Sequence, residues 1–467
     1  MIATSMASKV ERILGSNFDV VGKVGWVGFG FVAAQVIRLG TNIALAWLLA
    51  PALLGTMLLI NTLRTAGELL TDVGIGQSIV NNRRGEEAKF YNTAWTMQIV
   101  RGLLLFCVAL AASAPLASAY DDPRLSALVS VAAIVFVVSG FTSTNRFLLQ
   151  KRMEVRRSTT FNVSFALLGA IVHIVFALYS PTIWALLWGL IVSTLLTTIG
   201  TYFLIPENRH RLQWDREAFD QIFSFGKWIF FSSIVYFAAM NFDRLYLASA
   251  VPFAILGVYG VARTFADTIL FLFQRMANMI VFPKISESHM RGYELQETVA
   301  PLRYYTLLAV ATLLAAGLSI ADQFILWAYD QRFSAAAQYL PLMLLGTWFA
   351  ILASLSDAMM MGIGKPSITA YANAFKFAII ALAVPIVLPT YGLLIAIAFF
   401  SVAEIGRYVV LTLRMRGENL SFTRQDIAGT LAFIVMALVF RAGTGLVGLT
   451  SGVEGWAAIA NAAVVGV

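Results

Sequence analysis

The sequence is poor in the residues from which soluble enzymes and disulfide-linked domains are built. Its 467 residues include one cysteine, Cys107, and three histidines, and only 12% of them are charged. A single cysteine excludes an internal disulfide framework and a thiolate metal cluster. The histidines (His173, His210 and His289) lie too far apart for helical metal-ligand spacing. We therefore expect neither a metal site nor a cofactor. Soluble domains carry about 25% charged residues, so this chain cannot cover a water-facing surface.

Apolar residues dominate instead, at 59% of the chain. Runs of about 20 of them recur along its whole length, which is the length needed to cross a bilayer core of about 30 Å. We place spans at 24–49, 52–80, 92–114, 125–149, 161–180, 183–205, 223–249, 253–282, 302–328, 335–362, 366–388, 391–413, 426–448 and 454–467. The last run is short. The pattern predicts an all-α polytopic membrane protein with 12–14 transmembrane helices. Residues 1–26 lack the compact apolar core of a signal peptide, and we interpret them as a cytoplasmic amphipathic lead-in.

The basic residues in the connections and at the adjoining span ends indicate the orientation of the chain. The N-terminal segment and alternate connections, with their span ends, hold 21 of them: Lys9, Arg12, Lys23, Arg83, Arg84, Lys89, Lys151, Arg152, Arg156, Arg157, Arg209, Arg211, Arg216, Lys227, Lys284, Arg291, Arg303, Lys365, Arg414, Arg416 and Arg424. The opposite connections hold only Arg124 and Arg332. Because cytoplasmic loops are enriched in Lys and Arg, both termini are predicted to be cytoplasmic. The net charge of +8 then reflects topology and contact with anionic lipids, with no need for nucleic acid.

Two similar segments six spans apart indicate an internal repeat. The second span begins with "PALLG" and continues to Arg64, Thr65 and an acid, Glu68; the eighth begins with "PFAILG" and continues to Arg263, Thr264 and Asp267. Many transporters are built from such repeats. We expect a lead-in and six-helix bundle over 1–213, a second six-helix bundle over 214–414 and an extra hairpin over 415–467. Residues 205–221 are expected to form the cytoplasmic linker between the bundles.

Charged residues also occur inside the apolar spans. Those near span ends can reach the interface, which is the expectation for Arg146, Arg275, Lys376, Arg407 and Arg441. Five arginines lie deeper: Arg38, Arg64, Arg101, Arg244 and Arg263. A charge at the bilayer centre costs a few kcal/mol, so these should face partners or a wet cavity. On one continuous helix, Arg64, Glu68 and Asp72 would share a face. The faces predict a polar cavity between the bundles with more arginine than acid.

A simpler interpretation of two of these pairs stays open. Arg64–Glu68 and Arg263–Asp267 have the spacing of intrahelical ion pairs, which would neutralise each other without any role in transport. Asp243 and Arg244 are adjacent and point in different directions, so a local pair is less natural there. No connection exceeds about 20 residues, which leaves no room for a water-soluble catalytic domain. We therefore expect a transporter with no catalytic residues rather than an enzyme.

The chain resembles a known family at this point. The run "LAWLLAPALLGTMLLINTLRTAGELLTDVGIGQSIV", followed by "FYNTAWTMQIVRG", is similar to Wzx-type polysaccharide repeat-unit flippases of the multidrug/oligosaccharidyl-lipid/polysaccharide exporter superfamily. The run "NFDRLYLASAVPFAILGVYGVARTFADTI", ending in "FPKIS", resembles the seventh and eighth helices of the same family. The resemblance covers most of residues 20–425. Residues 426–467 match the extra helix pair of some members.

The resemblance implies two six-helix bundles around a central cavity that opens alternately to either side. It implies flipping of undecaprenyl-pyrophosphate-linked oligosaccharide to the outer leaflet of the bacterial cell (inner) membrane, for exopolysaccharide, lipopolysaccharide O-antigen or capsule synthesis. A polysaccharide polymerase or assembly complex is a possible partner. Arginine suits phosphate oxygens, which makes Arg38, Arg64, Arg101, Arg244 and Arg263 the candidate pyrophosphate contacts. Glu68, Asp72, Asp243 and Asp267 are the candidate gating or ion-coupling acids.

Two other functions stay open. A multidrug or cation exporter of the same superfamily would want a cavity with net acid, and the arginine excess counts against it. A membrane-embedded glycan polymerase or glycosyltransferase usually carries a large outer loop or a cytoplasmic catalytic domain. The short connections of this chain count against that class.

Overall fold

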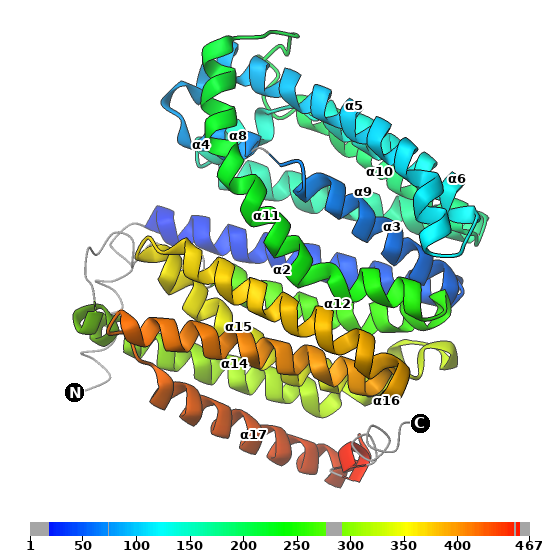
Figure 1. Cartoon of the computed structure of the whole chain (residues 1–467), viewed down its shortest axis with the longest axis vertical. Coiled ribbons are helices and arrows are strands. Elements are labelled where there is room, and N and C mark those ends of the chain that lie inside the picture. Colours follow the sequence, from blue (N-terminus) through cyan, green and yellow to red (C-terminus); the bar gives the residue numbers. More distant parts are fainter. Residues whose placement is uncertain (1–17, 73, 277–291, 453, 458–467) are drawn as a thin grey trace. The chain divides into compact units, whose positions relative to one another are not determined.

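The computed structural model describes residues 18–72, 74–276, 292–452 and 454–457 of the chain (Figure 1). Throughout these ranges the regular structure is helical and contains no strand. The lead-in up to residue 17, the "FPKIS" segment and the end of the predicted last span fall outside the described residues. The expected all-helical class is confirmed.

The helices follow the predicted spans closely. Their bounds are α2 (Phe18–Leu48), α3 (Pro51–Leu69), α4 (Ile75–Asn81), α5 (Ala88–Ala119), α6 (Arg124–Ala132), α7 (Ile134–Gly140), α8 (Asn145–Lys151), α9 (Val155–Tyr179), α10 (Ile183–Tyr202), α11 (Arg216–Ala250), α12 (Phe253–Met276), α14 (Gly292–Ala328), α15 (Ala336–Gly362), α16 (Pro366–Gly417) and α17 (Thr423–Leu446). Among the described residues, nine helices are long and apolar enough to cross a membrane, or ten if α6–α8, bent by 53°, count as one span. The protein is therefore a multi-pass membrane protein.

Glycines interrupt the helical path at two places, Gly392 and Gly74. A straight helix the length of α16 would extend for about 78 Å, far beyond a bilayer core. Gly392 interrupts it with φ 79° and ψ 178°, so its two halves form the two separate spans that the sequence predicts. Gly74, with φ 64°, separates α3 from α4 within the run predicted as one span. The expectation that Asp72 continues the Arg64–Glu68 stripe is therefore wrong, because α3 ends at Leu69 and the Asp72 carboxylate accepts a hydrogen bond from Gly74 N at 2.9 Å.

The described helices fall into two compact units. The first comprises the described parts of 1–41, 71–118 and 122–229, and the second those of 42–70, 119–121 and 230–467. Hence α3, from the first half of the sequence, lies in the second unit, where it packs against α12. A Cβ atom at Gly55 would come within 1.9 Å of Phe253 O, and one at Gly257 within 2.0 Å of Pro51 O. Only glycine allows this approach. The predicted domain boundaries after 213 and 414 stay a prediction.

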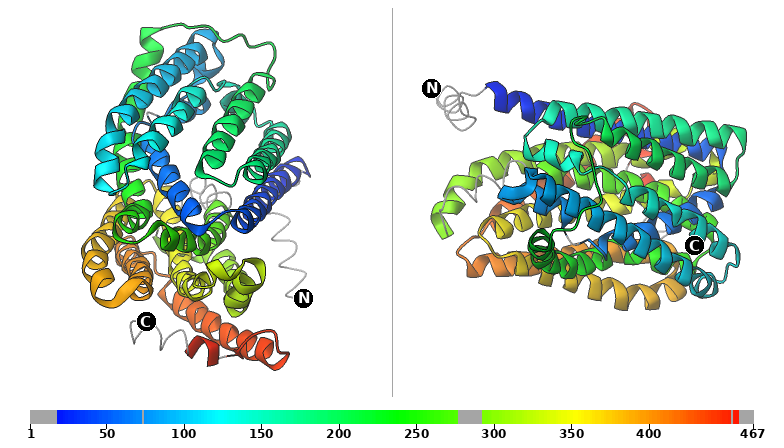
Figure 2. Two further views of the ribbon diagram at one scale, coloured as in Figure 1. Left: turned by 90° about the vertical axis from the view of Figure 1, so that its right-hand side faces the viewer. Right: turned by 90° about the horizontal axis from the view of Figure 1, so that it is seen from above.

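Helix α17 lies along α14 in the second unit (Figures 1 and 2). Near its start, Arg303 and Asp426 form a buried ion pair at 2.5 Å. Near its end, the Arg441 guanidinium donates two hydrogen bonds of 2.6 Å to Asp322. Arg441 is fully buried, so the expectation that it reaches the membrane interface is wrong. A buried guanidinium keeps its charge only where acids and carbonyls satisfy its donors.

The linker between the two predicted bundles is shorter than expected, because α11 already begins at Arg216. Within the first unit it lies against α5: the backbone N–H groups of Gln213 and Asp215 donate to Thr96 and Thr93 at 3.1 and 3.0 Å. The His210 ring contacts the rings of Tyr91, Trp95 and Tyr202. Burial lowers the pKa of His210, and a backbone hydrogen bond with Asn208 opposes that shift.

Candidate functional site

Four charged residues from α11 and α12 form one cluster in the second unit. Arg263 Nε lies 3.0 Å from Asp267 Oδ1, and Arg263 Nη1 lies 3.5 Å from Asp243 Oδ2. Arg244 pairs with the other oxygen of Asp267 and also donates to Asn241 Oδ1 at 3.1 Å. Asp243 and Arg244 therefore do not pair with each other: each pairs with a residue of α12, as their different directions on α11 suggest.

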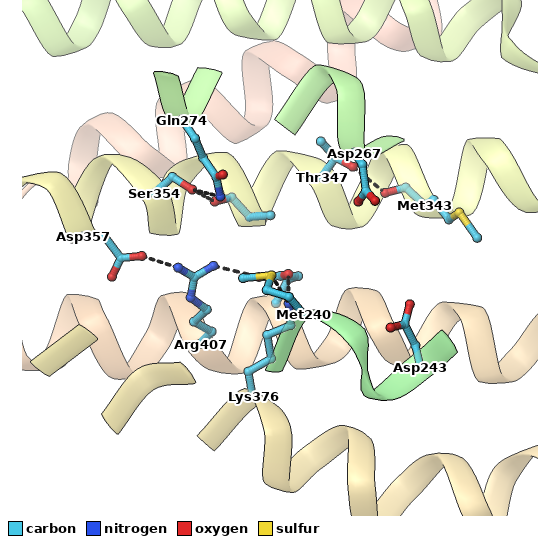
Figure 3. A network of polar contacts seen from close by, with 12 residues as sticks. Met240, Asp243, Asp267, Gln274, Met343, Thr347, Ser354, Asp357, Lys376 and Arg407 are labelled. Atoms are coloured by element: carbon cyan, nitrogen blue, oxygen red, sulfur yellow. Dashed lines mark hydrogen bonds and ion pairs between the residues drawn. The ribbon is translucent and has the colours of Figure 1, made fainter. Parts of the chain in front are cut away.

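A second group of charges lies on α15 and on both halves of α16 (Figure 3). Lys376 Nζ and Glu404 Oε1 are 2.5 Å apart, and Arg407 Nη1 lies 3.5 Å from Glu404 Oε2. Arg407 also pairs with Asp357 of α15. The Lys376 and Arg407 side chains are each only 3% exposed. The expectation that both extend to the membrane interface is therefore wrong.

A small cavity lies within the second unit, among α11, α12, α15 and α16. Its volume is about 40 Å³, which is room for about three water molecules. Five charged side chains line it: Asp243, Arg263, Asp267, Lys376 and Glu404. Its other walls include Phe400 and aliphatic side chains, with the hydroxyls of Thr347 and Ser401. The cavity thus joins the α11–α12 cluster to the Lys376–Glu404 pair.

The charges of the two groups balance. The four basic residues are Arg244, Arg263, Lys376 and Arg407, and the four acidic residues are Asp243, Asp267, Asp357 and Glu404. Removing an ion from water costs several kcal/mol unless a partner of opposite charge compensates. The predicted excess of arginine is therefore not found in this cluster. The predicted central cavity between the bundles stays a prediction.

The other predicted site residues lie elsewhere. Arg64 and Glu68 form an intrahelical ion pair of 2.6 Å on α3, as their spacing predicts, and their role in transport stays a prediction. Arg101, in the first unit, donates from Nε to Thr71 Oγ1 at 2.9 Å and lies 3.9 Å from Asp72. Arg38 lies on α2 in the same unit and is exposed. Of the nine predicted residues, the structure brings four into one cluster: Asp243, Arg244, Arg263 and Asp267.

Four members of the charge network had no assigned role in the sequence-based site: Asp357, Lys376, Glu404 and Arg407. Lys376 and Arg407 lie near predicted span ends, and for that reason they were expected to reach the membrane interface. Glu404 and Arg407 have i, i+3 spacing, which was a usable signal for an ion pair. The Lys376–Glu404 contact joins residues 28 positions apart on either side of Gly392, and no periodicity predicts it.

Within the described ranges, no group of three or more His, Cys, Asp and Glu side chains is arranged to hold a metal ion. The acids of the cluster are instead held by arginine and lysine. The arrangement can exchange one ionic partner for another, and it can hold a few water molecules beside fixed charges. Both properties suit the binding of a charged group inside a membrane.

Residues 44–338 match the family described as polysaccharide biosynthesis protein. The chain belongs to this family. It is 22% identical over 308 residues to the lipopolysaccharide biosynthesis protein WzxC of Escherichia coli (strain K12), an alignment covering 65% of this chain. That alignment spans 59% of the relative's own length, less than two thirds. The predicted relationship to Wzx-type proteins is confirmed.

Solved structures share the fold. The lipid II flippase MurJ, in an inward closed conformation, superimposes with a TM-score of 0.69 at 12% identity, covering 89% of this chain and 97% of MurJ. An inward-facing multidrug resistance MATE family transporter gives a TM-score of 0.64 at 13% identity, covering 86% of this chain and 95% of that transporter. At these identities the likeness shows the fold alone.

Proposed function

We propose that this protein flips undecaprenyl-pyrophosphate-linked oligosaccharide repeat units from the cytoplasmic to the outer leaflet of the bacterial inner membrane, without catalysing a reaction. The observation that carries the proposal is the match of residues 44–338 to the polysaccharide biosynthesis family. A relative named for lipopolysaccharide biosynthesis supports it, as does a solved structure with a similar fold that is named as a lipid II flippase. Both termini are proposed to be cytoplasmic, from the distribution of basic residues.

The chemistry of the cargo fits the charged cluster. A pyrophosphate brings negative charge into the membrane, where arginine can bind it through forked, charge-assisted hydrogen bonds. Arg263 lines a cavity together with Asp267, and Asp267, which also pairs with Arg244, is an acid that an entering anion can replace. Arg38, Arg64 and Arg101 are proposed as further contacts. Glu68, Asp72, Asp243 and Asp267 are proposed as the acids that couple transport to an ion or to helix movement.

The main rival is export of drugs or cations, since a MATE family transporter has the same fold. Its cargo would need acids without fixed basic partners. In the charge network described above every acid has an arginine or lysine within ion-pair distance, so a cation could bind these acids only by displacing a basic residue. A glycan polymerase or glycosyltransferase is the remaining candidate, and detecting sugar transfer by the purified protein alone would establish it.

The proposed function is tested in a strain from which the gene has been deleted. We expect undecaprenyl-pyrophosphate oligosaccharide to accumulate on the cytoplasmic side, with loss of surface polysaccharide, as measured by lipid extraction and mass spectrometry. The wild-type gene on a plasmid should reverse both effects. Normal surface glycan without a trapped intermediate, in a strain that lacks any redundant flippase, would contradict the proposal.

A further inference from the structure

Asp267 holds two arginines from two different helices at once. Its Oδ1 lies 3.0 Å from Arg263 Nε, and its Oδ2 accepts from Arg244 Nη2. The Asp267 side chain is 11% exposed, and it lines the cavity together with Arg263. Each oxygen of this carboxylate thus has its own guanidinium partner.

Two guanidinium groups that converge on the two oxygens of one carboxylate present the donor pattern that a phosphate group would need. A phosphate has three or four oxygens and binds arginine through the same forked hydrogen bonds. Because Asp267 forms ion pairs with both guanidinium groups, an entering phosphate has to compete with this carboxylate for them.

We propose that Asp267 is an internal competitor for the phosphate of the cargo: it occupies Arg244 and Arg263 when the protein is empty, and an incoming phosphate displaces it. This inference rests on the proposed function, because it takes pyrophosphate as the cargo's head group. It makes Asp267 a residue that sets affinity. Its carboxylate weakens binding and returns to the arginines when the cargo leaves.

The charge balance of the cluster gives the sign of the effect. The two groups together hold four basic and four acidic residues and are neutral, and Asp267→Asn would leave Arg244 without its ion-pair partner. A bound phosphate restores the balance. Removing this acid should therefore tighten phosphate binding, whereas removing an acid that binds the cargo or folds the site should weaken it.

Asp357 provides a matched control. It is also a buried acid paired with an arginine, Arg407, so its neutralisation removes one charge from the same network. Neither Asp357 nor Arg407 is among the residues that line the cavity. Asp357→Asn should therefore destabilise the protein without opening donors to a phosphate.

The test measures inorganic pyrophosphate binding to the full-length protein in lipid nanodiscs. The readouts are a titration and the shift of the thermal unfolding midpoint. For Asp267→Asn we expect a midpoint below wild type without pyrophosphate, a larger rise with it, and binding at least about tenfold tighter, the order expected when a charge-assisted hydrogen bond is gained. Asp357→Asn should bind pyrophosphate like wild type. Adding Arg244→Gln to Asp267→Asn should abolish the gain.

Two results would overturn the inference. One is an Asp267→Asn protein that binds pyrophosphate no more tightly than wild type; the other is an equal gain in Asp357→Asn, which would indicate a general effect of charge. If Asp267→Asn is unstable during purification, pyrophosphate in the buffers should recover it, and failure to recover it would count against the competitor role.

The assay separates this inference from the proposed function. It uses a soluble anion and requires no lipid-linked cargo and no movement across the membrane. If the expected pyrophosphate binding is not found, the role of Asp267 is contradicted, and the proposed function is still tested independently by the deletion strain. The expected binding combined with a deletion strain that lacks a trapped intermediate would establish an anion site and contradict the flippase proposal.

Discussion

Helices α3 and α12 carry the same local pattern in different surroundings. Each begins beside a proline, and each holds an arginine followed four residues later by an acid. On α3 the Arg64 and Glu68 side chains are 27% and 37% exposed; on α12 those of Arg263 and Asp267 are 17% and 11% exposed. Asp243 of α11 joins the α12 pair, which thereby becomes part of a buried network.

The difference shows that a repeated motif predicts a local contact but not how much that contact contributes to stability. A partly exposed i, i+4 pair contributes at most about 1 kcal/mol, since solvent screens it and ordering the side chains costs entropy. Removing one partner of a buried network leaves the other charge uncompensated, at about 3–5 kcal/mol. Burial, which the motif does not encode, separates the two cases.

The largest expected effect tests this difference directly. Arg263→Ala should lower the free energy of unfolding by about 3–5 kcal/mol, because Asp243 loses a partner and Asp267 keeps only Arg244. Arg64→Ala on α3 should cost about 1 kcal/mol or less. Denaturant unfolding in detergent micelles measures both. Equal losses in the two variants would show that the helices are alike after all.

An intermediate effect is expected where the two helices touch. Gly257→Ala should destabilise the protein by about 1–3 kcal/mol, because its Cβ would collide with the backbone oxygen of Pro51. Gly317 of α14 has open space around it, so Gly317→Ala should be neutral or stabilise by up to about 1 kcal/mol. Thermal unfolding of both variants checks the pair. A stable Gly257→Ala protein would indicate that α3 and α12 can separate without cost.

The smallest expected effect concerns the pH dependence of stability at His210, which lies outside both helices. His210 has a lowered pKa in the folded state, so its contribution to stability is complete above about pH 6.5 and declines as the pH falls through the unfolded value toward the folded one. Because solvent partly screens the ring, we expect a loss under about 1 kcal/mol. Unfolding at pH 7.5 and 5.5 should show a smaller pH dependence in His210→Gln than in wild type. An unchanged dependence would assign it to other groups.

The helices were predictable because span length and hydrophobicity are local properties of the chain. The break near Gly392 was also marked, by the gap between the two predicted apolar runs at 366–388 and 391–413. What the sequence did not mark was the end of α3 at Leu69, which removes Asp72 from the stripe. A helix end inside an apolar run depends on backbone and side-chain hydrogen bonds as much as on hydrophobicity.

The candidate site was predictable only where its contacts are short in sequence. The pairs on α3 and α12 follow from i, i+4 spacing, and the α11–α12 contacts join neighbouring helices. Arg407 and Asp357 are 50 positions apart and meet only because α15 packs against α16. The burial of Lys376 was also predicted wrongly, because its distance from a span end gives no information about the helices that cover it.

The two ion pairs that join α17 to α14 have a consequence for how the membrane protein is assembled. Helix α17 is made late in synthesis, and Asp426 and Arg441 within it would be costly to place alone in lipid. Their partners, Arg303 and Asp322, are already in the membrane on α14 when α17 emerges from the ribosome. Insertion of α17 therefore supplies the missing partner of both ion pairs at once. A chain truncated before Thr423 would leave Arg303 and Asp322 on α14 without these partners.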